Sequence, residues 1–453
     1  MYLYFIIIGA CLYFQAERGI FDFFSYLRLF QQFKKQNKIN QSASQKLYIL
    51  IPALCEQMII EETILSFCKI KNPKIDIEIA IITSVREKTN KLDGVHPTTD
   101  EVVAKSMDSG KLREYSESIH VFQDPARHGN MATQLNYAIK KIKYLAKPDD
   151  FYMVFNADSI ISKRTIEKFS QLIGQYPGKE FAFQQPCAFV RDMGPAANQF
   201  TNALSLYQSW YCLGHESRLV RNYDDKSKKY WNGKEHNKLG VIVGHGSGMT
   251  FNINTSNNGY PTDLLTEDLT FGFILSADNI PILSLQALEV ADVPNRYIMF
   301  IKQKSVWFWN FLGYPSCYKK TRAQGFSRYR PILLLIQGIG AGAYWFFDTF
   351  FIITPLLLGI TLGSYQIVLL SLISFLFFYI TPQYFLLQKL PTILAEQGFP
   401  IHAQNVRNTS FIKLLPSLCL IILTNSVGAW IATIRGVKYL LTGKLPKKYK
   451  TGD

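Results

Sequence analysis

The sequence contains no C-x-x-C pair, although seven cysteines occur among its 453 residues. Cysteines at that spacing hold zinc or form a redox-active pair, so the pattern argues against both kinds of site. The cysteines are scattered and odd in number, which favours reduced, buried thiols. Reduced thiols agree with a cytoplasmic position for the domain that carries most of them.

Acidic residues are scarce relative to basic ones: 34 Asp and Glu against 49 Lys and Arg give a formal net charge of +15. Such a charge attracts either nucleic acid or an anionic membrane surface. No nucleic-acid recognition motif accompanies it, so we expect no nucleic-acid partner. Aromatic-rich apolar runs beside Lys and Arg favour contact with the anionic cytoplasmic leaflet.

Charge is nearly absent from several long apolar stretches. Tyr2 to Phe14 is shorter than the roughly 20 residues that span a bilayer, and no cleavage site follows it, so we expect an uncleaved anchor leading into an interfacial helix. The alternative is a buried helix of a soluble domain. The C-terminal stretches are 331–347, 349–363, 365–387 and 411–434, and Asp348 is the notable interruption between the first two.

These C-terminal stretches predict membrane helices, and length alone leaves open whether 331–363 forms one helix or two. The basic tail after Ile434 should lie on the same side as the basic central domain, which favours four crossings. We therefore expect a multi-pass protein of the inner or plasma membrane with its central domain in the cytoplasm. The expected parts are an anchor and interfacial helix at 1–44, a central domain at 45–310, and interfacial and transmembrane helices at 311–453.

Between about residues 45 and 300 the pattern is one of short β-type apolar runs separated by charged helical stretches. The runs 47–51, 78–83 and 151–155 are each followed by polar residues. This pattern is typical of an α/β domain with a mainly parallel sheet, whose ligand lies along the carboxyl ends of the strands.

Acids occupy two places where such a site would form. Asp158 directly follows the run 151–155, where its carboxylate could bind Mg²⁺ or Mn²⁺ beside a diphosphate; the alternative is a turn or a helix N-cap. Asp268, in Thr266-Glu267-Asp268, follows the glycine-rich residues 244–248 and 259–261. It could act as a general base, or Thr266 could simply cap a helix.

A third segment, Gln303-Lys304-Ser305-Val306-Trp307, precedes the membrane region. Its aromatic residues suit both a membrane interface and the faces of sugars, and an aromatic belt without other function is the alternative.

The order and spacing of these segments resemble the family 2 glycosyltransferases with a GT-A domain. Residues 51–56 resemble the first strand and its Pro-x-x-Asn-Glu loop, and 129–136 the helix before the metal motif. Asn156 to Asp158 stands at the Asp-x-Asp position, Thr266 to Asp268 at Thr-Glu-Asp, and Gln303 to Trp307 at Gln-x-x-Arg-Trp.

The resemblance implies an inverting hexosyltransferase that moves a sugar from a nucleotide-sugar donor to a membrane-associated acceptor. That acceptor would be a lipid-linked saccharide, a polyisoprenyl phosphate or a surface polysaccharide. Asp268, with Glu267 beside it, would be catalytic, and Asp158 would bind Mg²⁺ or Mn²⁺. The donor would contact Pro52, Glu56, Glu87, Asn136, Asn156, Gln303 and Trp307.

The sequence departs from the family pattern around the expected diphosphate. Cys55, Asn156 and Val306 stand where Asn, Asp and Arg are usual, and Glu87 stands near a missing Asp pair. The loss of Arg favours single transfer over processive synthesis. The departures motivate an alternative function, a catalytically degenerate domain serving as a membrane scaffold for polysaccharide-export partners. Residues that could restore positive charge, or form surface salt bridges instead, are Arg127, His128, Arg296 and Lys304; His215 and His245 are expected to be structural.

Overall fold

The structure is a computed structural model. It describes residues 2–34, 45–70, 72, 75–89, 97–127, 129–173, 181–216, 247–253, 259–262, 267–325 and 329–442. Residues 244–246, Thr266 and His128, which entered the predictions above, lie outside the described residues.

A seven-stranded sheet in the order β3-β2-β1-β4-β8-β6-β9 forms the centre of the domain. Every pairing is parallel except the two made by β8. The strands are β1 (Gln45–Pro52), β2 (Ile75–Ser84), β3 (Ile119–Asp124), β4 (Phe151–Val154), β6 (Ala182–Gln184), β8 (Met249–Asn252) and β9 (Ile282–Ser284). The expected α/β class with a mainly parallel sheet is confirmed.

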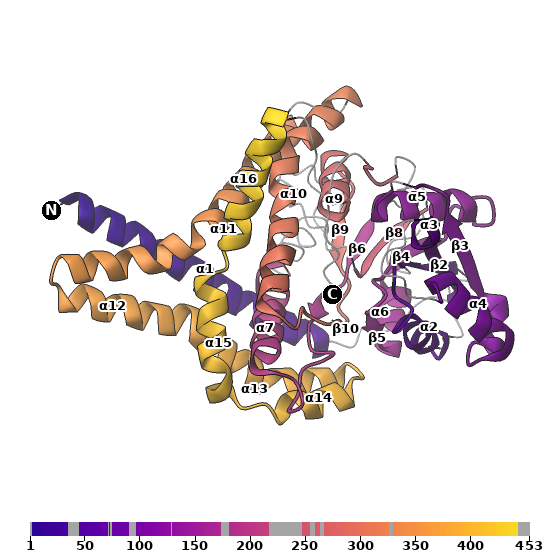
Figure 1. Cartoon of the computed structure of the whole chain (residues 1–453), viewed down its shortest axis with the longest axis horizontal. Coiled ribbons are helices and arrows are strands. Elements are labelled where there is room, and N and C mark those ends of the chain that lie inside the picture. The colour runs from indigo at the N-terminus through magenta and orange to yellow at the C-terminus, as the bar shows by residue number, and fades with distance from the viewer. Residues whose placement is uncertain are drawn as a thin grey trace.

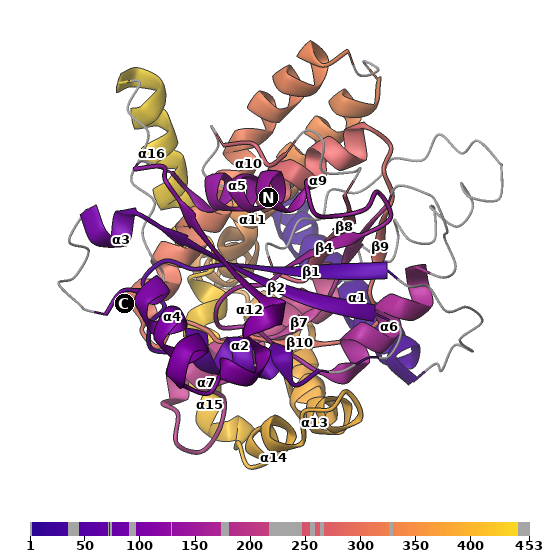
Figure 2. The ribbon, with the colours of Figure 1, turned by 90° about the vertical axis from the view of Figure 1, so that its right-hand side faces the viewer.

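Both faces of this sheet are covered by helices, as its nearly continuous apolar strands require. Leu47, Ile49 and Ile51 of β1 pack with α2 (Ile60–Cys68), α4 (Thr99–Ser109) and α6 (Lys163–Ile173). Tyr48 and Leu50 point to the other face and pack with α5 (Met131–Ile142) and α9 (Asp268–Ala277). Figure 2 shows α5 and α9 on one side of the strands and α2 and α4 on the other.

A smaller sheet of two-residue strands lies beyond the carboxyl ends of the large one. It consists of β5 (Ile160–Ile161), β7 (Cys187–Ala188) and β10 (Glu289–Val290), in the order β5-β10-β7. Because β5, β7 and β10 follow closely after β4, β6 and β9, the small sheet extends the edge where those strands end. The remaining helices of this part are α3 (Arg86–Thr89), the 3₁₀ helix η1 (Arg113–Ser118), α7 (Gln199–Trp210) and the π-helix η2 (Tyr211–Glu216).

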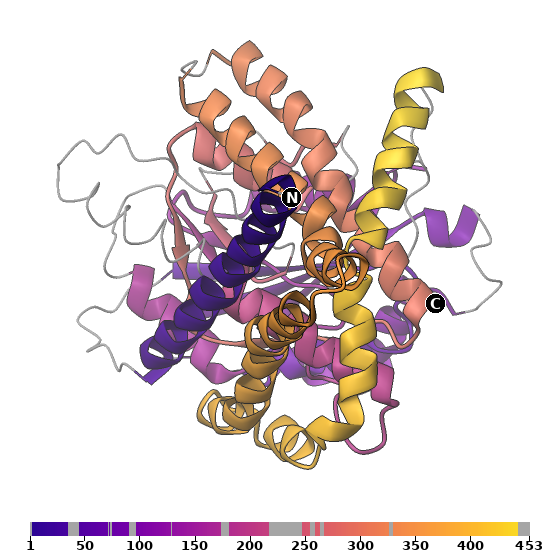
Figure 3. The same ribbon diagram turned by 90° about the vertical axis from the view of Figure 1, so that its left-hand side faces the viewer.

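Four helical segments are long and apolar enough to cross a membrane: Tyr2–Lys34, Tyr329–Thr361, Tyr365–Glu396 and Phe411–Tyr439. The first, α1, runs beside α11 and α12, which Figure 1 shows projecting away from the sheet and Figure 3 shows from their own side. The individual helices are α1 (Tyr2–Lys34), α11 (Tyr329–Thr361), α12 (Tyr365–Phe375), the π-helix η4 (Leu376–Ile380), α13 (Thr381–Glu396), α14 (Pro400–Arg407), α15 (Phe411–Leu423) and α16 (Val427–Thr442).

Two sequence predictions change here. The expected anchor and interfacial helix form one continuous helix, α1, of 33 residues. The stretch 331–363 forms one helix, α11, so the C-terminal region has three candidate spans and the prediction of four was wrong.

Helix α10 (Tyr297–Ala323) joins the sheet domain to the membrane helices and is held closely between two of them. On α11, a Cβ at Gly338 would overlap the Tyr314 ring, and one at Gly342 would lie 2.9 Å from Cβ of Phe311. On α16, a Cβ at Gly428 would lie 2.6 Å from Cβ of Lys304. Glycines thus let both helices approach α10 at backbone distance, which is how small residues promote helix packing in membranes.

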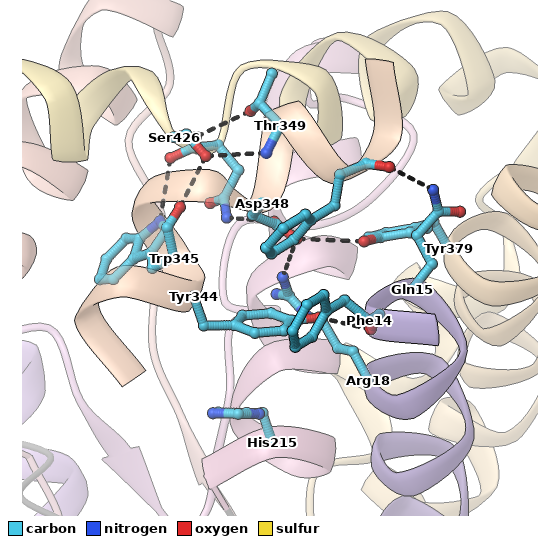
Figure 4. A network of polar contacts seen from close by, with 12 residues as sticks. Phe14, Gln15, Arg18, His215, Tyr344, Trp345, Asp348, Thr349, Tyr379 and Ser426 are labelled. Carbon is cyan, nitrogen blue, oxygen red and sulfur yellow. Dashed lines mark hydrogen bonds and ion pairs between the residues drawn. The ribbon is translucent and has the colours of Figure 1, made fainter. Parts of the chain in front are cut away.

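The charged residue inside α11, Asp348, is buried in a polar network that joins the membrane helices to each other (Figure 4). Its carboxylate lies 2.7 Å from the guanidinium of Arg18 on α1. It also accepts hydrogen bonds from Tyr379 at 3.2 Å and Asn425 at 3.0 Å. Asn425 lies in the break between α15 and α16, where backbone groups freed from the helix need partners within the protein.

Candidate functional site

The two predicted acids, Asp158 and Asp268, lie at the same edge of the large sheet. Asp158 follows the carboxyl end of β4 directly. Asp268 begins α9, which leads into β9; because β9 is oriented like β4, the start of α9 lies at the edge where the parallel strands end. The fold therefore places a strand-end acid and a helix-start acid on one side of the domain.

A buried hydrogen-bonded group fixes the loop that carries Asp158. The next residue, Ser159, donates to the carboxylate of Glu289 on β10 at 2.5 Å, and Ser247 donates to the same oxygen. Glu289 is fully buried, and Gly248, with φ of +71°, passes close to its second oxygen. Glu289 thereby joins the Asp158 loop, the start of β8 and β10 into one rigid unit.

Asp158 itself meets a second carboxyl group, that of Asp292, which follows β10. The two side chains share a hydrogen bond. Burial, and after it the charge of Asp158, raise the pKa of Asp292 well above its ordinary value, because desolvation and a neighbouring carboxylate both disfavour its ionised form. Arg191 holds the loop from the other side, donating from Nη1 to the Asp158 carbonyl at 2.8 Å and from its backbone to Ala291 at 3.1 Å.

Sequence reasoning missed Asp292, Glu289 and Arg191. Asp292 carries a weaker form of the signal that identified Asp158, because the short stretch 287–291 before it is apolar except for Glu289. The strand before it is only two residues long, which is too short for its periodicity to stand out. The partners of Glu289 and Arg191 lie far away in the sequence.

The second acidic pair occupies the start of α9. Glu267 is buried and Asp268 is half-buried, at a helix N-terminus, where a negative charge is stabilised by the helix dipole. Burial and the charges of Glu267 and Asp268 raise the pKa of Tyr260. Asp268 also acts on Tyr314 of α10, whose pKa is raised chiefly by burial. Both acids therefore lie near the loop carrying Tyr260, and Asp268 also lies near helix α10.

Glu87 has a defined role in the first loop, at the end of β1. Its carboxylate accepts hydrogen bonds from the backbone of Cys55 at 2.8 Å and of Thr99 at 2.7 Å, and Thr99 in turn accepts from the backbone of Glu56 at 3.0 Å. Cys55 adopts a left-handed backbone with φ of 57°. Glu87 thus shapes the turn that follows Pro52, and a contact with the donor base would have to compete with these bonds.

Asn136 lies on α5 and binds backbone. Its side-chain amide donates to the Tyr260 carbonyl at 2.8 Å and accepts from the Tyr260 amide at 2.7 Å. This pair of bonds fixes the segment at Gly259 and Tyr260 that leads to Asp268. Asn156, by contrast, is exposed at the strand-end edge beside Asp158.

Gln303 and Trp307 lie on α10, and both are half-buried. Gln303 accepts a hydrogen bond from Gln208 of α7 at 2.8 Å. Because Trp307 and Tyr314 are seven residues apart, they share one face of α10, about 10 Å apart along the axis. The aromatic segment 303–307 therefore lies on the same helix as Tyr314, the residue of α10 on which the charge of Asp268 acts.

The membrane region reaches the Asp158 side of the site through the segment between α13 and α14. Gln397 accepts a hydrogen bond from the backbone of Leu288 at 3.3 Å, just before β10. On α14, burial and the charge of Arg191 lower the pKa of His402, while Asp192 opposes this. His215 was expected to be structural, and it contacts Asp22 of α1 at 3.3 Å.

No family model and no curated protein matches this chain. Among solved structures, it is similar to the mannosyltransferase PcManGT from Pyrobaculum calidifontis, in complex with GDP-Man and Mn²⁺. The identity is 14% and the TM-score 0.47, over 90% of this chain and 99% of that one. It is also similar to S. aureus TarS 1–349 in complex with UDP-GlcNAc, at 12% identity and TM-score 0.33, over 89% and 93% of the two chains.

Proposed function

We propose that this protein is an inverting family 2 glycosyltransferase with a GT-A domain at 45–310. It would transfer a sugar from a nucleotide-sugar donor to an acceptor held at a membrane. The observation that carries the proposal is the placement of two acidic pairs, Asp158 with Asp292 and Glu267 with Asp268, at one edge of a mainly parallel sheet. Ligands of open α/β sheets bind at that edge.

Asp158 and Asp292 fit a divalent cation of the Mg²⁺ or Mn²⁺ kind. Carboxylate oxygens are the ligands such cations prefer, and a cation between the two acids would offset the repulsion of their charges. In the described part of the chain, no cluster of three or more His, Cys, Asp or Glu side chains could hold a metal, so the donor diphosphate and water would complete the coordination. The bound cation would neutralise charge on the departing nucleoside diphosphate.

Asp268 is the proposed base. The acceptor oxygen attacks the anomeric carbon, the bond from that carbon to the diphosphate oxygen breaks, and the hydroxyl proton passes to the Asp268 carboxylate. Displacement from the opposite face inverts the anomeric configuration. Glu267 and Asn136 position the segment that carries the base, and Glu56, Glu87 and Pro52 shape the loop that would face the nucleotide.

The acceptor is proposed to reach the site along α10. This helix packs against two candidate membrane spans and carries the half-buried Trp307. The acceptor would be a lipid-linked saccharide or a surface polysaccharide growing at the cytoplasmic face of the inner or plasma membrane. Its reacting end would lie beside α10, where the membrane helices meet the catalytic domain.

The test is turnover by the purified full chain in detergent with Mg²⁺ or Mn²⁺ and a panel of UDP-, GDP- and dTDP-sugars. A lipid extract supplies acceptors, and released nucleoside diphosphate is measured. Asp268→Asn should lower the rate about 10²- to 10⁴-fold, the usual contribution of a general base. Asp278→Asn, an exposed acid at the other end of α9, is the matched control and should leave the rate unchanged. Equal rates for Asp268→Asn and the control would refute the assignment of the base.

The alternative function, a scaffold in a polysaccharide-assembly complex, is motivated by Asn156 and Val306 at positions where the family has charged residues. It predicts that the unmodified chain turns over no donor while still associating with export partners.

A further inference from the structure

The side chain of Lys304 is enclosed by aromatic rings where α10 meets the catalytic domain and the membrane helices. Only 2% of Lys304 is exposed. Its ammonium lies 4.2 Å from the centroid of the Trp307 ring. Four further ring centroids lie at 5.5–5.8 Å, those of Tyr207, Tyr211, Phe300 and Trp345. Among the described residues no hydrogen bond or ion pair of this ammonium is recorded, so the rings are its partners.

The five rings around the Lys304 ammonium form an aromatic cage. The cage rings that lie on neighbouring helices are held in place by further contacts. Trp345 of α11 donates from Nε1 to the Asn425 carbonyl at 3.1 Å, and its own carbonyl accepts from Ser426 at 2.7 Å (Figure 4). Tyr207 of α7 adjoins Arg18, which Asp348 holds. The position of Lys304 is fixed as well, because α16 crosses it at Gly428.

Trp307 differs from these other rings of the cage. It is half-buried, and in the described part of the chain its recorded ring interaction is with Lys304. The two residues are three positions apart on α10, so they are neighbours on the helix surface. One face of the indole is therefore covered by a cation that is itself fixed.

We propose that Lys304 is a positioning residue for the acceptor: its ammonium holds one face of Trp307 so that the partly exposed side of the ring can stack on the acceptor saccharide. This inference rests on the proposed function, since it presupposes a sugar acceptor. The attraction between an ammonium and an indole face grows when water is excluded, as it is in this cage.

Only the protonated form of Lys304 can act in this way. Burial lowers its pKa to about 7; Glu216 of η2 raises it and Arg18 of α1 lowers it. The other titratable groups around the cage are Tyr207, Tyr211, His215, which stacks on Tyr211, and Asp22 and Asp348, which hold Arg18. The cation is thus present below about pH 7 and is lost as the pH rises through that value. Acceptor binding should weaken over the same interval.

The experiment compares the acceptor KM, donor KM and kcat of the full chain with those of Lys304→Met and Lys304→Arg at pH 6, 7 and 8. Lys304→Met should raise the acceptor KM about tenfold, with donor KM and kcat nearly unchanged, as expected for loss of one desolvated cation–π contact. Lys304→Arg should restore the acceptor KM and abolish its rise with pH, because arginine stays charged. Lys319→Met, an exposed lysine of the same helix, is the control. An unchanged acceptor KM in Lys304→Met, or a loss confined to kcat, would overturn the proposal.

A second readout needs no turnover and separates this inference from the proposed function. Tryptophan fluorescence of the unmodified chain should change with a midpoint near pH 7 as the ammonium loses its proton. The change should be missing in Lys304→Met and smaller in Trp307→Phe, where Trp345 is the remaining tryptophan beside the ammonium. If the transition keeps its full size in both variants, Lys304 does not hold the indole, whatever the protein catalyses.

Discussion

Replacing Arg18 by methionine should destabilise the protein more than replacing its partner Asp348 by asparagine. The pair is 2.7 Å apart, with 13% of the Arg18 side chain and 1% of the Asp348 side chain exposed. When Arg18 is removed, the partners that Asp348 keeps among the described residues are the neutral donors Tyr379 and Asn425. Arg18 keeps a second acid, Asp22 at 3.9 Å, when Asp348 is neutralised.

The magnitudes follow from this asymmetry. Arg18→Met leaves a buried, uncompensated carboxylate, which costs about 3–5 kcal/mol. Asp348→Asn preserves the shape of the site and removes one charged partner, which costs about 1.5–3 kcal/mol. The double variant has no buried carboxylate to strand at this position, so it should be more stable than Arg18→Met alone.

The assay is the midpoint of thermal unfolding of the detergent-purified chain. Arg28→Met serves as control because Arg28 is exposed on the same helix. The expected order of midpoints is unmodified and Arg28→Met, then Asp348→Asn, then Arg18→Met, with the double variant above Arg18→Met. If Arg18→Met matches the control, or if the double variant loses the sum of the two single effects, the account of this network is wrong.

Two further substitutions test how the site is held. Gly338→Leu should lower the unfolding midpoint, by the equivalent of about 1–3 kcal/mol or more, because the new side chain collides with the Tyr314 ring; Gly340→Leu, two residues along in open space, should not. Asn136→Leu removes both hydrogen bonds to the Tyr260 backbone, so it should lower the free energy of unfolding by about 1–3 kcal/mol and lower turnover as well. An unfolding midpoint equal to that of the unmodified chain would show that these two hydrogen bonds contribute nothing to stability.

Local patterns in the sequence were enough to predict the parallel strands and the strand-end acids. The apolar runs at β1, β2 and β4 are continuous because both faces of the sheet are buried, and Asp158 is the first acid after β4. Asp268 was found in the same way, from its place after glycine-rich residues and before an apolar helix. The topology then explains why these separate segments meet at one edge.

Long-range pairing could not be predicted from one sequence. Asp348 was noticed as an interruption of the apolar stretches. Its partner Arg18 lies 330 positions away, on a helix that was interpreted from its apolar residues. Glu87 was assigned to the nucleotide from its place near a missing Asp pair, and its bonds to the backbone of Cys55 and Thr99 leave no pattern in the sequence. Four C-terminal crossings were expected from the position of the basic tail, whereas the structure has three candidate spans there because 331–363 forms one helix.

The central claim is that Asp158 and Asp268 serve one reaction in different roles, Asp158 as a metal ligand and Asp268 as the base. Measuring donor binding distinguishes the two roles, because only the metal ligand should affect it. The measurement is calorimetric binding of the donor that turns over, with Mn²⁺, to the unmodified chain, Asp268→Asn and Asp158→Ala. Asp268→Asn should bind the donor with unchanged Kd while failing to transfer it. Asp158→Ala should bind it more weakly and lose the gain that Mn²⁺ provides. Normal transfer by Asp268→Asn, or Mn²⁺-dependent binding by Asp158→Ala equal to that of the unmodified chain, would contradict the account.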